Sequence, residues 1–279
     1  MYLRVSDISK HFGCAKATST KLRKPAKSGG KNVIDSTRGD TQATTVGKAA
    51  HTIVQHVLKT PPEQRTEEHN KVREALNSMK NDVQMPKKIS EILGDDYLSG
   101  SIHDELLMSS WKECNELLNC SMDLLGFLEK IPKSVGKWGI KKEMEIHDGK
   151  LPVKVPYKKE IFGTKTSLHG SIDLVFEFGD LLVVTELKTG EYADWKRNTW
   201  ELQTQIYIDA CKYIFPEKKI IGMIVHSGIE EGYQWVNKLD SWTESLVDRE
   251  STEPGDHCQY CELKATCSGS WYKQNNTLR

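Results

Sequence analysis

The sequence has no excess of either charge, since 39 Lys and Arg residues are matched by 39 Asp and Glu residues. Net charge therefore does not indicate a charged partner, and any surface that binds nucleic acid must be a local patch. The sequence also lacks an apolar run long enough to span a membrane, and its N-terminal MYLRVSDISKHFG contains no long apolar stretch. We expect a soluble, cytoplasmic protein, in the host cytoplasm if it is viral, with no membrane association.

The chain also lacks the cysteine pattern of a disulfide-stabilised protein. Its seven cysteines are an odd number and are unevenly spread, which favours a reducing, intracellular compartment. Two local basic regions are present. Residues 10–31 hold seven Lys or Arg and no acidic residue, and residues 130–165 hold ten Lys against four acidic residues. Such runs are typical of solvated segments, and contact with a nucleic-acid backbone is the sharper alternative.

The clearest pattern is the stretch GSIDLVFEFGDLLVVTELKTG at residues 170–190. Apolar residues alternate up to position 178, as in a pleated strand, and residues 181–187 are apolar nearly throughout, as in a strand covered on both faces. Gly179-Asp180 between them suits a two-residue hairpin turn. With that turn Phe178 pairs with Leu181, and the sequence predicts a β-hairpin.

This register places Asp173 directly across from Glu186, with Cβ atoms about 5 Å apart. Lys188 points to the same face, and the opposite face, where Ile172 pairs with Leu187, is expected to join the core. Two opposed carboxylates destabilise a sheet unless something neutralises them, and a divalent cation with oxygen ligands does so. The alternative is a solvated hairpin face with an ordinary charge pair.

The remaining pattern predicts one mixed β-sheet with helices on both faces, an α/β (α+β) fold. Helices are expected at residues 45–58, 62–84, 101–130 and 195–215. Strands are expected at residues 138–147, 151–158, 170–178, 181–188, 219–227 and 233–236.

Two of these helices carry further candidate residues. His51 shares an apolar stripe with Val54 and Leu58, so it faces inward, either as a hydrogen-bonded core residue or as a metal ligand. Gln203 and Tyr207 lie one turn apart on the same helix face. Such a pair is by itself typical of an ordinary surface or boundary position.

The C-terminal segment contains a second strong signal. Cys258, Cys261 and Cys267 have the spacing C-x2-C-x5-C, which is typical of metal or cluster ligands. A fourth ligand is needed, and Cys14 or His257 could supply it. The spacing does not distinguish an iron–sulfur cluster from a structural zinc site.

Together these motifs resemble a known family. Gly170-Ser-Ile-Asp173, Glu186-Leu-Lys188 and Gln203-x-x-x-Tyr207 resemble the RecB-type motif series of the PD-(D/E)XK nuclease superfamily. The upstream His51, one N-terminal cysteine and three C-terminal cysteines resemble its iron–sulfur branch. That branch includes the CRISPR-associated RecB-like exonucleases, the nuclease parts of bacterial helicase–nucleases, and related phage nucleases.

The resemblance implies roles for these residues. His51, Asp173, Glu186 and the backbone carbonyl of Leu187 would ligate Mg²⁺ or Mn²⁺, and Lys188 would activate or orient the attacking water. Gln203 and Tyr207 would help to hold the DNA strand. Cys14, Cys258, Cys261 and Cys267 would together hold a [4Fe–4S] cluster that joins the two ends of the chain.

We therefore expect a single restriction-endonuclease-like nuclease domain over residues 1–279. It comprises an N-terminal segment at 1–44, a helical part at 45–135, the core sheet at 136–240 and a cluster-binding segment at 241–279. The expected function is that of a metal-dependent deoxyribonuclease, an exonuclease acting on single-stranded DNA ends, with protein partners in adaptation, recombination or replication. The alternatives are a cluster-containing DNA-binding accessory protein with weak turnover and a zinc-stabilised structural protein.

Overall fold

The structure is a computed structural model that describes residues 2–5, 42–78, 104–130, 145–148, 158–161, 164–178 and 180–236. In this part of the chain the main sheet has five strands in the order β2-β5-β6-β7-β8. Their bounds are β2 Glu145–Asp148, β5 Leu174–Phe178, β6 Leu181–Leu187, β7 Lys219–Val225 and β8 Tyr233–Trp235. β6 and β7 are parallel and the other neighbours are antiparallel, so the expected mixed sheet is confirmed.

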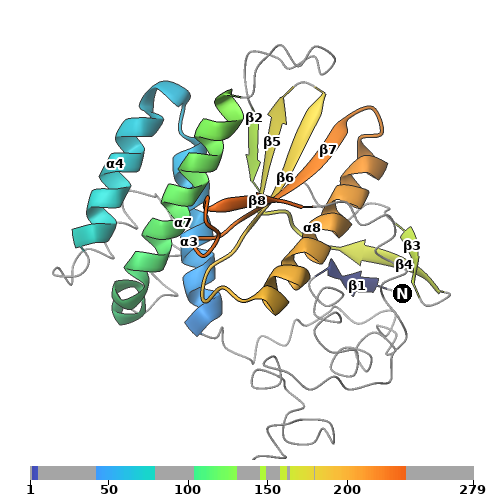
Figure 1. Cartoon of the computed structure of the whole chain (residues 1–279), viewed down its shortest axis with the longest axis horizontal. Coiled ribbons are helices and arrows are strands. Elements are labelled where there is room, and N and C mark those ends of the chain that lie inside the picture. The colour runs from blue at the N-terminus through green and yellow to red at the C-terminus, as the bar shows by residue number, and fades with distance from the viewer. Residues whose placement is uncertain are drawn as a thin grey trace, which may run out of the picture.

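Helices cover both faces of this sheet (Figure 1). One face carries α3 Gln42–Lys59 and α7 Asp104–Lys130, with α4 Pro62–Ser78 packed outside them. The other face carries α8 Asp194–Ile214, which connects β6 to its parallel neighbour β7. Each face buries its own apolar cluster against the sheet. The helices at 62–84 and 101–130 are confirmed as far as the structure describes them.

The apolar spacing of α3 explains its position. Val46, Ala50, Ile53 and Val57 recur every three or four residues and are all buried. The helix ends before the Pro61-Pro62 pair, which cannot continue its hydrogen-bond ladder. Pro62 instead opens α4, where its missing N–H costs nothing.

The β5–β6 hairpin has the predicted register, with Phe178 opposite Leu181, and every residue of β6 is buried. One detail of the prediction is wrong, because the strand begins at Leu174 instead of residue 170. Asp173 bends out of the ladder, and Ile172 consequently packs with the α8-side cluster while Leu187 packs with the α3 side. Ile172 and Leu187 therefore do not share a core face.

A second sheet was not predicted. β1 Tyr2–Arg4 pairs in parallel with β4 Thr164–His169, and β3 Lys158–Ile161 pairs with β4 in antiparallel. The predicted strand at 138–147 overlaps β2, and its residues 138–144 lie outside the described part of the chain. The predicted strand at 151–158 shares only residue 158 with β3, and its other residues also lie outside the described part.

The four proposed cluster cysteines, Cys14, Cys258, Cys261 and Cys267, lie outside the described residues. So does His257, the alternative fourth ligand. None of the described helices is long and apolar enough to cross a membrane.

Candidate active site

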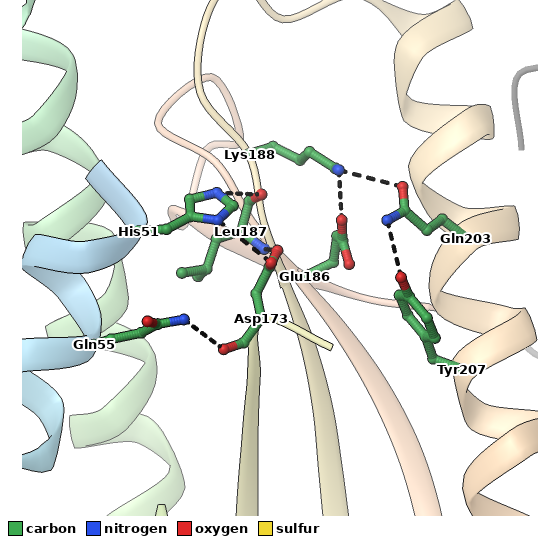
Figure 2. A network of polar contacts seen from close by, with 8 residues as sticks. All are labelled: His51, Gln55, Asp173, Glu186, Leu187, Lys188, Gln203 and Tyr207. Carbon is green, nitrogen blue, oxygen red and sulfur yellow. Dashed lines mark hydrogen bonds and ion pairs between the residues drawn. The ribbon is translucent and has the colours of Figure 1, made fainter. Parts of the chain in front are cut away.

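The candidate residues come together where β6 ends, between α3 and α8 (Figure 2). Glu186 and Leu187 end β6 and Lys188 follows them. His51 reaches the site from α3, and Gln203 and Tyr207 reach it from α8 (Figure 2). Residues predicted from four separate segments therefore form one polar network.

His51 contacts two of the other predicted metal ligands. Its Nε2 lies 3.1 Å from the backbone oxygen of Leu187, and its Nδ1 lies 3.3 Å from Oδ1 of Asp173. Both partners are acceptors, so the doubly protonated imidazolium can donate to both. Burial lowers the pKa of His51, but the Asp173 charge and hydrogen bond outweigh it, and the pKa lies above its usual value.

Asp173 is held from two elements. Its Oδ2 accepts the Leu187 N–H at 2.9 Å, and its backbone oxygen accepts a hydrogen bond from Nε2 of Gln55 at 3.0 Å. Burial raises the pKa of Asp173, but His51 and Lys188 outweigh this effect and lower the pKa below its usual value. Gln55 was not singled out in the sequence, although it lies one turn after His51 on α3 and so shares its face.

Glu186 is the most enclosed carboxylate of the site, with 2% of its surface exposed. Its Oε1 accepts a hydrogen bond from Nζ of Lys188 at 2.5 Å. Its Oε2 is buried and has no hydrogen-bond partner among the residues that the structure describes. Burial and the Asp173 charge raise the pKa of Glu186 to about 7.

Lys188 connects this carboxylate to α8. Its Nζ also donates to Oε1 of Gln203 at 3.3 Å, and Nε2 of Gln203 lies 3.5 Å from the Tyr207 hydroxyl. Burial lowers the pKa of Lys188, but Glu186 and Asp173 raise it above its usual value, which favours the ammonium form. Tyr207 is 3% exposed and its pKa is raised, first by burial and then by the Glu186 charge.

The donor atoms suit a hard divalent cation. Two carboxylates, one imidazole and a backbone carbonyl form an oxygen-rich set, which favours Mg²⁺ or Mn²⁺ over zinc. Among the described residues, no three His, Cys, Asp or Glu side chains are grouped as a metal site. His51 and Asp173 are paired with each other, and Glu186 Oε1 is paired with Lys188. Oε2 of Glu186, which has no partner in the described part of the chain, fits a bound cation that would satisfy this buried oxygen.

This geometry agrees with a comparison of the whole chain with protein families. Residues 27–268 match the model of the PD-(D/E)XK nuclease superfamily. The chain belongs to this superfamily. The PD-(D/E)XK fold agrees with the mixed sheet and its flanking helices, and the protein is a metal-dependent nuclease that acts on phosphodiester bonds. No curated protein matches the chain significantly.

Proposed function

We propose that this PD-(D/E)XK nuclease is a Mg²⁺- or Mn²⁺-dependent exonuclease that hydrolyses single-stranded DNA from its ends. The observation that supports it most is the convergence of Asp173, Glu186 and Lys188 on one network at the end of β6. The choice of DNA ends as substrate rests on the resemblance of the motif series to RecB-like nucleases.

The metal would be held by His51, Asp173, Glu186 and the Leu187 carbonyl. Glu186 Oε2 could bind the metal without losing a contact to a described residue. His51 and Asp173 would have to give up the contact between them to bind it. When bound, a cation of this type would lower the pKa of its water towards neutrality and would polarise the phosphate. The Gln55 and Leu187 contacts keep Asp173 in place for this role.

The protein groups divide the remaining work. Hydrolysis joins a water oxygen to phosphorus and breaks the bond to the leaving oxygen, which takes up a proton. Lys188 donates hydrogen bonds from a fixed position between Glu186 and Gln203, and we assign it to orienting the attacking water. Gln203 and Tyr207 form the α8 wall of the site, where they would hold the strand.

The iron–sulfur branch adds a second proposal. Cys14, Cys258, Cys261 and Cys267 would hold a [4Fe–4S] cluster that joins the two ends of the chain, with a structural zinc ion as the alternative. This proposal rests on the cysteine spacing and on the motif order of the resemblance.

One digestion experiment tests the function. Single- and double-stranded DNA, labelled at one end and blocked at the other, is incubated with Mg²⁺, Mn²⁺ or EDTA. We expect metal-dependent shortening of single strands from the unblocked end. Cutting of circular or doubly blocked DNA would instead show an endonuclease, and tight DNA binding without turnover would favour the accessory protein.

A further inference from the structure

His226 lies directly after β7, is 1% exposed, and contacts two loop backbones. Its Nδ1 accepts the N–H of Gly228 at 2.7 Å, so this nitrogen carries no proton. The ring proton is therefore on Nε2, which lies 2.9 Å from the Gly190 carbonyl and donates to it. Together the two contacts fix a neutral ring in one tautomer.

Aromatic side chains keep this ring from turning. Trp200 of α8 stacks on it, with ring centroids 5.1 Å apart and an angle of 26° between the planes. Tyr192 lies 5.5 Å from the His226 ring and 6.0 Å from the Trp200 ring. A Cβ added at Gly228 would lie 2.4 Å from Cβ of Tyr192, so the two loops also meet closely. The cluster joins α8 to the loops that follow β6 and β7.

The Gly190 carbonyl, which His226 binds, lies two residues after Lys188 in the loop that follows β6. The Lys188 N–H donates to the Val225 oxygen at 3.0 Å, which extends the β6–β7 pairing by one residue. Two residues later Gly190 has a φ of +87°, a conformation that favours glycine. The backbone is thus tied to Val225 at Lys188 and to His226 at Gly190, where φ is positive.

We infer that His226 is a positioning residue for Lys188, which it fixes through the Gly190 carbonyl and the backbone between them. The inference rests on the proposed function, in which Lys188 must be held in place to orient the attacking water. A nucleophile-orienting group misplaced by about 1 Å can lose about 100-fold in rate, so a tether outside the reacting atoms can matter.

The electrostatics around the ring support this assignment. Burial lowers the pKa of His226, and Lys196 of α8 lowers it further. The Gly190 hydrogen bond and Glu116 of α7 raise it, but the pKa stays below its usual value. The neutral ring, which alone can accept from Gly228 and donate to Gly190, is therefore favoured.

Two substitutions separate positioning from packing. His226→Phe keeps an aromatic ring against Trp200 and Tyr192 but removes both hydrogen bonds, while His226→Gln keeps an N–H donor that can reach Gly190 and loses the ring. Gly190 and Gly228 are exposed, so water can replace their lost partners. We expect the melting temperature of His226→Phe to exceed that of His226→Gln.

Turnover should follow the opposite order. We expect kcat on end-labelled single-stranded DNA to fall by roughly 10- to 100-fold in His226→Phe, less in His226→Gln, with KM little changed. Deuterium uptake over residues 188–193 should rise in His226→Phe. The matched control is His69→Phe, a histidine that contacts Asn119 far along the chain, and it should leave all these values unchanged.

Each outcome bears on one claim. Opposite orders of kcat and melting temperature support the positioning role. A kcat that follows the melting temperature, or that stays within about twofold of wild type in both variants, overturns it. A ¹⁵N spectrum with the His226 proton on Nδ1 at neutral pH also overturns it. A wild-type protein that cuts no DNA with either metal removes the proposed function itself.

Discussion

The backbone N–H of Leu187 donates a hydrogen bond to the Asp173 carboxylate, with 2.9 Å between nitrogen and Oδ2. The backbone pairing of β5 and β6 ends at Leu174 and Thr185. Beyond that point the Asp173 side chain, in place of a backbone carbonyl, accepts the hydrogen bond from β6. The other carboxylate oxygen, Oδ1, lies 3.3 Å from His51. The conformation of Asp173 is therefore set by β6 and α3 together.

Substitution of Lys188 tests the chemistry most directly. We expect Lys188→Ala to lower the cleavage rate by about 10²- to 10⁴-fold while DNA affinity changes little, because the role we propose for Lys188 is to orient the attacking water. Single-turnover cleavage and DNA binding in EDTA measure the two effects. Lys112→Ala is the control, since Lys112 is 72% exposed and pairs with Glu116 on α7. Near wild-type turnover in Lys188→Ala would remove the mechanism.

The two readings of His51, a proposed metal ligand and a core residue, can be measured separately. If it is a metal ligand, His51→Ala should raise the metal concentration needed for cleavage. Because His51 already contacts Asp173 and Leu187 without metal, we also expect a loss of about 1–3 kcal/mol of stability in EDTA. Metal titrations of activity and urea unfolding in EDTA measure the two. A stability loss with unchanged metal dependence would show that His51 is a core residue only.

A control on the same helix sharpens this test. His56 pairs with Glu68 of α4 at 3.0 Å. We expect His56→Ala to alter stability only, with the metal requirement unchanged. An equal rise in metal requirement in both variants would show that α3 acts through its packing and not through a ligand.

The hairpin and its partner residues could be predicted because they follow regular periods. The two-residue turn predicted which residue of β5 pairs with which residue of β6. Helical spacing placed His51 on an inward face, and it placed Gln203 and Tyr207 on one shared face of their helix. Gln55 and His226 could not be found this way. Their partners are backbone carbonyls far along the chain. Every residue has a backbone carbonyl, so the residue types in the sequence do not reveal which carbonyl is bound.

The second sheet was missed for a related reason. β1 and β4 share three paired positions, from Tyr2 opposite Ser167 to Arg4 opposite His169. Strands this short have too few residues for a period to be recognised, and β4, with sequence TKTSLH, is mostly polar. β1 and β4 are also far apart in the sequence, and the local pattern of apolar residues cannot predict a pairing between distant segments.

The pH dependence of stability tests the His226 contacts. The folded pKa is lowered, so the unfolded chain, with an imidazole pKa of about 6.5, binds the proton first as pH falls. The contribution of His226 is therefore complete above about pH 6.5 and is lost progressively below it. In urea unfolding between about pH 8 and 5, the free energy of unfolding of the wild type should fall relative to that of His226→Phe as the pH is lowered. Parallel curves for the two proteins would contradict the assignment.

The cysteines make a prediction about metal content. Cys14→Ala should lose brown colour, iron and sulfide, and should unfold more readily, because the link between residues 14 and 258 no longer closes the chain. Wild-type protein purified without air should contain about four iron and four sulfide per chain. One zinc without sulfide would show a zinc site. Full metal content in Cys14→Ala would exclude the N-terminus as fourth ligand. Cys211→Ala is the control, since Cys211 is a buried cysteine in no disulfide among the described residues and belongs to the apolar cluster between α8 and the sheet.

Two glycines provide a matched test of how closely the backbone approaches Tyr207. A Cβ at Gly170 would lie 2.5 Å from Cε1 and 2.8 Å from the hydroxyl oxygen of Tyr207, so the ring must move. We expect Gly170→Ala to lose about 1–3 kcal/mol of stability and to reduce cleavage beyond what that loss explains. In α7, a Cβ at Gly126 would meet no atom within 4 Å, so Gly126→Ala should gain about 0.5–1 kcal/mol.

The cause of the Gly170 effect can be isolated by removing the ring that it meets. In a Tyr207→Ala background the added Cβ has space, so the stability cost of Gly170→Ala should shrink by most of its value. Urea unfolding of the two single variants and the double variant gives the coupling between the positions. A cost that is the same in both backgrounds would mean that Val5, whose Cγ2 would lie 3.0 Å from the Cβ, resists the substitution instead.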